Sequence, residues 1–163
     1  MRRSVQILLV CCAIAPMVAG ADSDVADVGR DVGAVLAWRL GPEFVEEKCR
    51  DVDPDGAEAR KTALATWLAR NAALIKTVDE RVAEVVPLAF PSPDPATRVA
   101  AVRDKVKQLL LETISAEGDA SQLKMACKEE ANPASPRWSM NGVPQVQNSL
   151  AALYDWKIQK EKK

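Results

Sequence analysis

The sequence predicts an all-α fold, a single-domain helical bundle of five or six helices that carries one disulfide. Apolar residues recur at spacings of three and four through most of the chain, which is the pattern of helices with one buried face. No stretch alternates apolar and polar residues over enough positions to make a convincing strand. No internal repeat divides the chain, so one domain is expected.

Residues 1–21 are predicted to be a signal peptide. Arg2 and Arg3 precede an apolar run from Val5 to Val18, and the Ala-Gly-Ala of positions 19–21 offers the small residues that a signal peptidase reads. The run falls short of the roughly 20 apolar residues that a spanning helix needs. Cleavage after residue 21 would leave a mature domain of residues 22–163 without a transmembrane segment, located in the periplasm or secreted.

Two cysteines remain in the predicted mature chain, Cys49 and Cys127. Because thiols of exported proteins meet an oxidising compartment, we expect them to form a disulfide. The alternative is a pair of free, buried thiols. A bridge over so long a loop would contribute up to about 4.5 kcal/mol in the chain-entropy model.

Residues 22–50 are predicted to form two helices. The first extends from Asp22 to Leu40, where valines recur at helical spacing. Gly41 and Pro42 are expected to end it, because proline removes a backbone donor and clashes with the preceding turn. Pro42 also suits the first turn of a short second helix, Glu43–Arg50.

The central helix is predicted from Asp55 to Val86, and the other helices are expected to pack against it. Trp67 lies in the middle of its apolar stripe and is expected to be its most consequential side chain. Pro87 is expected to end the helix, and Leu88–Asp94 to form a stiff linker. The apolar stripe consists of Leu64, Trp67, Leu68, Leu74, Ile75, Val78, Val82, Val85 and Val86.

The next helix is predicted from Pro95 to about Ala116. Asp94 is a good N-cap residue, and proline is favoured at the first helical position. Gly118 is expected to end this helix.

A shorter helix follows to about Ala131, capped by Asp119, and Asn132–Gly142 is predicted to be a loop. The last helix is predicted to begin at Val143. Its inward-facing residues are expected to be Val146, Leu150, Leu153, Tyr154 and Ile158.

The connector between the second and the central helix resembles half of a calcium-binding loop. Asp51, Asp53 and Asp55 are followed by Gly56 in the order D-x-D-x-D-G, in which three carboxylates converge on calcium. Thr62 stands where the closing bidentate glutamate belongs, so these aspartates are a weak metal candidate. The alternative is that Asp53 caps a helix whose first residue is the following proline.

Three residues are candidates for binding. Trp138 lies in a loop bounded by prolines, where it either anchors a protein partner or folds back to close the bundle. Asn71 interrupts the central apolar stripe beside Arg70, where it either fixes helix pairing or belongs to a recessed polar site.

The composition argues against catalysis and against nucleic-acid binding. The chain has no histidine, which removes the commonest general base and metal ligand. After loss of the signal, 20 basic residues face 23 acidic ones, whereas nucleic-acid binding favours a basic face. No motif calls for a cofactor.

We therefore expect an exported, non-catalytic protein that binds an envelope or secreted protein, in the manner of an inhibitor or immunity-type protein. The alternative is a periplasmic module that binds a small ligand or calcium.

Overall fold

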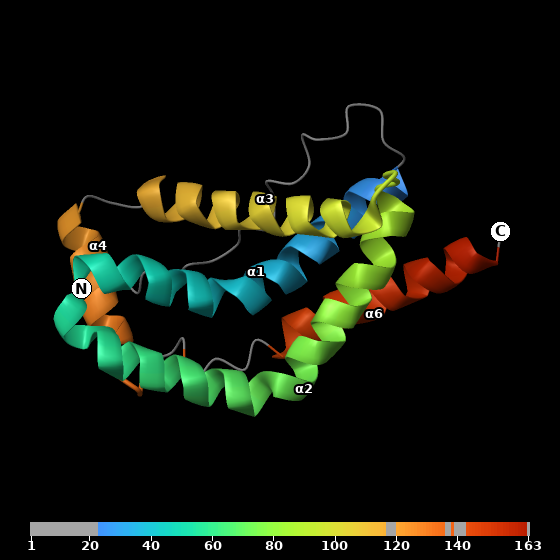
Figure 1. Cartoon of the computed structure of the whole chain (residues 1–163). Helices are drawn as coiled ribbons and strands as arrows, with labels where there is room; N and C mark the ends of the chain where they lie inside the picture. The colour runs from blue at the N-terminus through green and yellow to red at the C-terminus, as the bar shows by residue number, and fades with distance from the viewer. Residues whose placement is uncertain (1–22, 117–119, 136–137, 139–142, 163) are drawn as a thin grey trace.

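Five α-helices and one 3₁₀ turn make up the described part of the chain, in this computed structural model (Figure 1). The structure describes residues 23–116, 120–135, 138 and 143–162, and within them no strand is present. The predicted all-α, single-domain fold is confirmed, whereas the predicted signal peptide lies outside the described residues. The elements are α1 (Ser23–Val52), η3 (Pro54–Gly56), α2 (Ala57–Ala89), α3 (Pro95–Ala116), α4 (Ala120–Glu130) and α6 (Val143–Glu161).

Helix α1 continues through Gly41 and Pro42, so the predicted break at these residues is wrong. The residue before a proline is normally kept out of the helical region by a clash that involves its Cβ, and glycine has no Cβ. Leu40 on one side of the proline and Phe44 on the other are both buried, so the core holds both halves of α1. Tertiary packing thus outweighs the lost backbone hydrogen bond.

Helix α2 also passes its predicted end at Pro87 and extends to Ala89. A proline in the last turn removes only one donor, and Val86 and Ala89 on either side of it are buried. The backbone N–H of Phe90 donates to the carbonyl of Val86 at 2.9 Å and closes the helix.

The main core is formed by α1, α2, α3 and α6. Helix α1 packs against each of the other α-helices, and Figure 1 shows it between α3 and the first half of α2. The central place predicted for α2 therefore belongs at least equally to α1. The buried residues of this core are Val28, Val32, Val35, Leu36, Leu40, Val78, Val82, Val85, Val86, Ala89, Val106, Val146, Leu150 and Leu153.

Tyr154 on the last helix was predicted to face inward but lies at the surface. Tyr154 on α6 is 49% exposed, and its ring lies under the guanidinium of Arg81, 4.7 Å from ring centroid to Cζ. It follows the buried Leu153 by one position, and a step of one residue turns a side chain by about 100° around the helix, here to the edge of the apolar face.

The predicted disulfide Cys49–Cys127 is confirmed. Its Cα atoms are 5.2 Å apart, within the range that such a bridge spans, and it joins the last turns of α1 to α4.

Asp94 caps α3 as expected, since its Oδ1 accepts from the backbone N–H of Ala96 at 3.0 Å and of Thr97 at 3.3 Å. Gly118, which was predicted to end α3, and Asp119, which was predicted to cap α4, lie outside the described residues.

Candidate functional site

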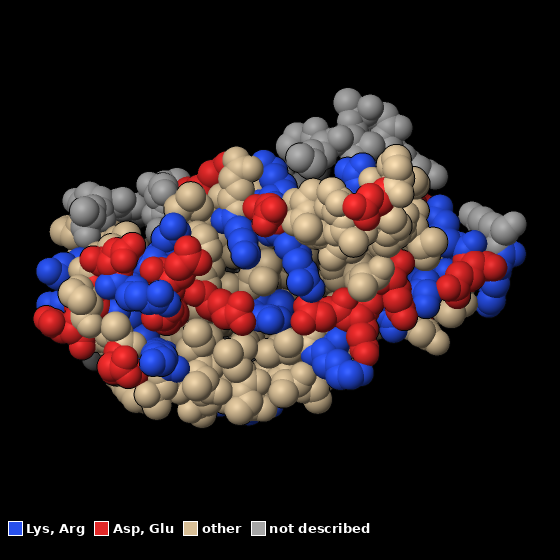
Figure 2. All heavy atoms as spheres, viewed as in Figure 1, with Lys and Arg blue, Asp and Glu red and all other residues tan. Residues whose placement is uncertain are grey.

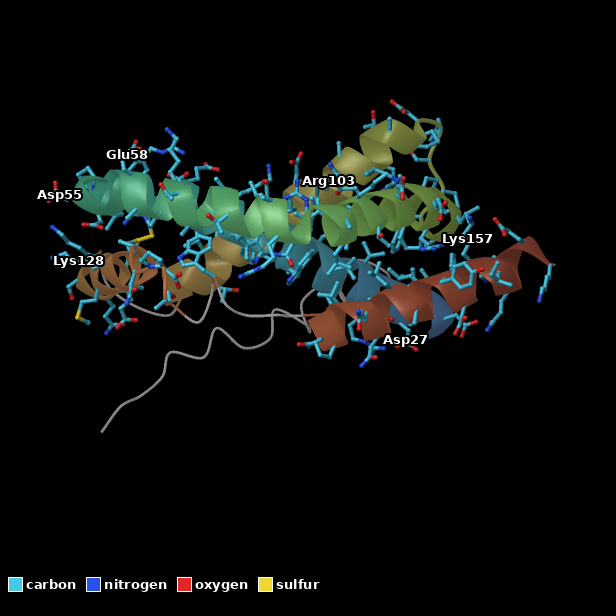
Figure 3. All side chains as sticks on the ribbon, turned by 90° about the horizontal axis from the view of Figure 1, so that it is seen from below. Asp27, Asp55, Glu58, Arg103, Lys128 and Lys157 are labelled. Carbon is cyan, nitrogen blue, oxygen red and sulfur yellow. A yellow bond between two sulfur atoms is a disulfide. The ribbon has the colours of Figure 1, made fainter. Side chains whose placement is uncertain are left out.

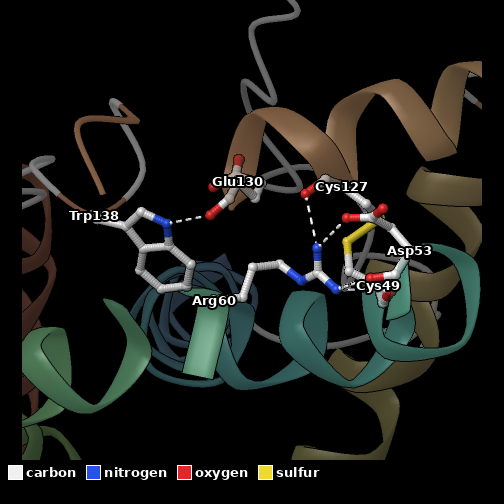
Figure 4. A network of polar contacts seen from close by, with 6 residues as sticks. All are labelled: Cys49, Asp53, Arg60, Cys127, Glu130 and Trp138. Atoms are coloured by element: carbon white, nitrogen blue, oxygen red, sulfur yellow. Dashed lines mark hydrogen bonds and ion pairs between the residues drawn. A yellow bond between two sulfur atoms is a disulfide. The ribbon is translucent and has the colours of Figure 1, made fainter. Parts of the chain in front are cut away.

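Arg60 is completely buried and binds both ends of the disulfide-bridged segment (Figure 4). Its Nη1 donates to Oδ2 of Asp53 at 2.7 Å and to the carbonyl of Cys127 at 3.1 Å. Its Nη2 donates to the carbonyls of Cys49 at 3.1 Å and of Asp53 at 2.5 Å. One guanidinium therefore connects α1, the connector, α2 and α4 at the bridge.

This arrangement accounts for the aspartate-rich connector. Asp53 occupies the predicted N-cap position before Pro54, but its carboxylate is buried in the ion pair with Arg60 and makes no capping hydrogen bond. Asp51 and Asp55 are exposed, and Figure 3 shows Asp55 beside Glu58 at the outer start of α2. Among the described residues, no group of three or more His, Cys, Asp or Glu side chains is placed to hold a metal ion.

Position 56 requires glycine because atoms of neighbouring residues lie close to its Cα. A Cβ at this position would lie 2.4 Å from Oδ2 of Asp53 and 2.5 Å from Nη1 of Arg60. It would also lie 2.9 Å from Cβ of Ala131. The glycine thus leaves room for the ion pair, a role that differs from the sharp turn of a calcium loop.

Arg60 was not singled out from the sequence, since arginine side chains are seldom fully buried. The helical period nevertheless places Arg60 on the buried stripe, three residues before Ala63 and seven before Trp67, both of which are buried. The position of Arg60 in the helical period therefore indicated burial, but its charge favoured an exposed position.

A second cluster lies two turns further along α2 and contains Trp67 and Trp138. Both indoles are buried, and the Trp67 ring also contacts that of Trp38, with 5.1 Å between centroids. Nε1 of Trp138 donates to the carbonyl of Glu130 at 2.8 Å, as Figure 4 shows. Trp138 therefore folds back onto α2 and is fixed to the end of α4.

A pocket of about 130 Å³ opens between α2 and the segment that follows α4. Its walls are formed by Thr62, Ala63, Thr66, Trp67, Arg70, Pro133 and Trp138. The two threonine hydroxyls donate to helix carbonyls, Thr62 to Glu58 and Thr66 to Thr62, so their protons are already used within α2. Apart from the guanidinium, the pocket is therefore a mainly apolar recess.

Arg70 lies at the pocket with an exposed side chain. Its Nη2 donates to the carbonyl of Trp138, and no carboxylate of the described residues forms an ion pair with it. Two of the three predicted binding residues, Arg70 and Trp138, are thus brought together. Asn71 is placed apart from them, since it is buried, does not line the pocket, and donates its Nδ2 to the carbonyl of Trp67 at 2.8 Å.

On α2, the described surface beside the pocket carries little charge. Arg70 is the one charged residue between Lys61 and Lys76, and Figure 2 shows an uncharged area over the first half of α2. We call this exposed surface the α2 face. It consists of Thr62, Ala65, Thr66, Ala69, Arg70, Ala72 and Ala73.

Comparisons with known proteins place the chain beside none of them: no family model, no curated protein and no solved structure matches it. None of the described helices combines the length and the apolar character needed to cross a membrane.

Proposed function

We propose that this chain is an exported, non-catalytic helical protein that binds another protein through the α2 face and its pocket. The observation that supports this most directly is the recess of about 130 Å³ beside Arg70, within an exposed and otherwise uncharged helix surface. Protein interfaces typically have an apolar centre from which charged residues are depleted. The predicted signal peptide, together with a disulfide of the kind formed in oxidising compartments, supports an envelope or secreted partner.

The size of the pocket favours a protein side chain over a small molecule. Pockets that hold drug-sized ligands measure about 300–1,000 Å³, whereas 130 Å³ accommodates little more than one side chain. The indoles of Trp67 and Trp138 supply an apolar lining for it. A partner would therefore insert one apolar side chain here and spread the rest of its contact over the α2 face.

Charge complementarity identifies a second feature of the partner. In the part of the chain that the structure describes, the guanidinium of Arg70 makes one hydrogen bond, to the carbonyl of Trp138, and a planar guanidinium matches a carboxylate in two parallel hydrogen bonds. We therefore assign to the partner an aspartate or glutamate close to the apolar side chain that enters the pocket.

A second copy of this chain fits the same surface poorly. A twofold interface places the same patch on both sides, and Arg70 lies near the middle of the uncharged stretch. Two copies of Arg70 would then approach one another near the axis, where like charges repel.

The test is capture of a partner by three baits that differ at single positions. The oxidised mature chain is cross-linked in envelope extract beside Arg70→Glu, which reverses the charge at the pocket, and Thr66→Trp, which fills it. Lys61→Glu, an equally exposed reversal on α2 next to the α2 face, is the matched control.

The proposal predicts one protein that wild type and Lys61→Glu recover equally and that both pocket variants lose by at least tenfold. Equal recovery with Arg70→Glu, or recovery of no protein by wild type, would overturn it.

A further inference from the structure

Helix α4 and residues 131–135 contribute no buried residue to the main core. All residues of that core come from α1, α2, α3 and α6. On α4, Cys127 is buried and Leu123 is half-buried, whereas Met125 is 63% exposed. Helix α4 instead joins α1 through a small apolar cluster, in which Cys127 and Leu123 pack with Val45, Cys49 and Val52.

Cys127 makes two attachments of α4 to the rest of the molecule. Its sulfur is bonded to that of Cys49, and its carbonyl accepts from Nη1 of the buried Arg60. An isolated helix of eleven residues is marginal in water, so α4 depends on such attachments to remain folded.

Contacts continue from Cys127 to the wall of the pocket. The backbone N–H of Ala131 donates to the carbonyl of Cys127 at 3.2 Å, and that of Trp138 donates to the carbonyl of Ser135 at 3.0 Å. The indole of Trp138 is bonded to the carbonyl of Glu130, the last residue of α4. Pro133 and Trp138 then form the side of the pocket that faces α2. The disulfide and the pocket wall thus belong to one segment.

We infer that formation of the Cys49–Cys127 disulfide completes the pocket, so that the chain becomes competent to bind only after oxidation. The claim that oxidation controls binding rests on the proposed function. The claim that the bridge completes the pocket rests only on the contacts between Cys127 and the pocket wall. In the oxidation, the two thiols give two electrons and two protons to a disulfide-carrying oxidant, which leaves as a dithiol. Because both sulfur atoms are buried, the completed bridge is shielded from thiols in solution.

Hydrogen–deuterium exchange with mass spectrometry tests the structural part without a partner. The oxidised chain is compared with the Cys49→Ala/Cys127→Ala variant, and with wild type that was unfolded in urea, reduced by dithiothreitol and refolded in its presence. Loss of the bridge is expected to speed exchange at least tenfold in residues 120–135 and to change residues 28–40 and 78–89 less than twofold. Equal protection of 120–135 in all samples, or a loss spread evenly over every helix, would overturn the inference.

Trp138→Ala with the bridge intact is the matched control. It removes the far end of the segment while Cys127 stays attached, so faster exchange is expected after Ala131 and unchanged exchange within α4. If α4 loses its protection equally in this variant, the bridge is not what holds it.

The capture assay separates this inference from the proposed function. Equal recovery of the partner by wild type and by Cys49→Ala/Cys127→Ala contradicts gating by oxidation and leaves the proposed function standing. Failure of wild type to recover a partner removes the proposed function, while the exchange comparison still decides whether the bridge completes the pocket.

Discussion

Nη1 of Arg60 lies 2.7 Å from Oδ2 of Asp53, and both side chains are shielded from water, with exposures of 0% and 6%. A buried ion pair is stable only when further hydrogen bonds satisfy its remaining groups. The two Nη atoms of Arg60 meet this condition through the carbonyls of Cys49, Asp53 and Cys127, whereas its buried Nε has no hydrogen-bond partner in the described part of the chain. The pair therefore fixes the relative positions of α1, α2 and α4 where the disulfide joins the chain.

Replacing Arg60 by methionine is expected to lower the free energy of unfolding by about 3–5 kcal/mol. The substitution leaves the carboxylate of Asp53 buried without its counter-charge, which is the costly way to break such a pair. Chemical denaturation of the oxidised protein measures the change. Lys61→Met, at an exposed neighbour that pairs with Glu58, is the control and should cost no more than about 1 kcal/mol. Similar values for the two variants would contradict this account of Arg60.

Gly56→Ala is expected to lower the unfolding free energy by about 1–3 kcal/mol, the range of an overpacked interior. The φ of Gly56 is −86°, which any residue adopts, so the loss is steric and arises from the contacts with Asp53 and Arg60. Denaturation of Gly56→Ala beside Asp55→Ala, an exposed neighbour, gives the comparison. In an Asp53→Ala background the same substitution should cost less, because one of the three atoms that the added Cβ would crowd is gone.

Local signals predicted some elements well and failed at others for identifiable reasons. The start of α3 follows from Asp94 and Pro95, because capping depends on residues within one turn. Pro42 and Pro87 carry equally local signals, yet both helices continue through them. There the burial of flanking residues, which sequence neighbours do not reveal, outweighs the lost hydrogen bond.

The sequence indicated some residues of the candidate site but not how they come together. Arg70 and Trp138 were each singled out, but they are 68 positions apart and their contact depends on how the chain returns from α4 to α2. Thr66 and Pro133, which complete the pocket, carry no individual signal in the sequence. The helical period could have predicted the burial of Arg60. Its partner Asp53 lies in a connector that has no helical or strand periodicity, so the ion pair could not be predicted in the same way.

Trp67→Ala is expected to lower the unfolding free energy by about 3–5 kcal/mol, as for other large aromatic side chains in cores. Trp67 is 2% exposed and contacts both Trp38 and Trp138, so truncation removes the middle of the cluster. Tyr154→Ala, at a half-exposed aromatic whose ring pairs with Arg81, is the control and should cost about 1 kcal/mol or less. Both are measured by denaturation with the disulfide intact. A loss under about 1 kcal/mol for Trp67→Ala would mean that its burial contributes little to folding.

The cap at Asp94 predicts a specific dependence of stability on pH. The hydroxyl of Thr97, followed by the backbone N–H groups of Thr97 and Ala96, donates to the carboxylate and lowers the pKa of Asp94 below its ordinary 3.8. The unfolded chain then binds the proton more readily than the folded one, so stability rises with pH through this range. The contribution of the charge is complete above the unfolded pKa and is lost as pH falls through the lowered folded pKa.

Asp94→Asn isolates this contribution, because asparagine is an equally favoured cap that carries no titrating charge. The difference in unfolding free energy between wild type and Asp94→Asn is expected to be constant above about pH 5 and to shrink as the pH falls toward about 3. Urea denaturation at a series of pH values measures it. A difference that does not change with pH would show that the negative charge adds nothing to the cap. Asp94→Ala, which also removes the acceptor for the N–H groups of Ala96 and Thr97, should remain less stable than Asp94→Asn at every pH in the series.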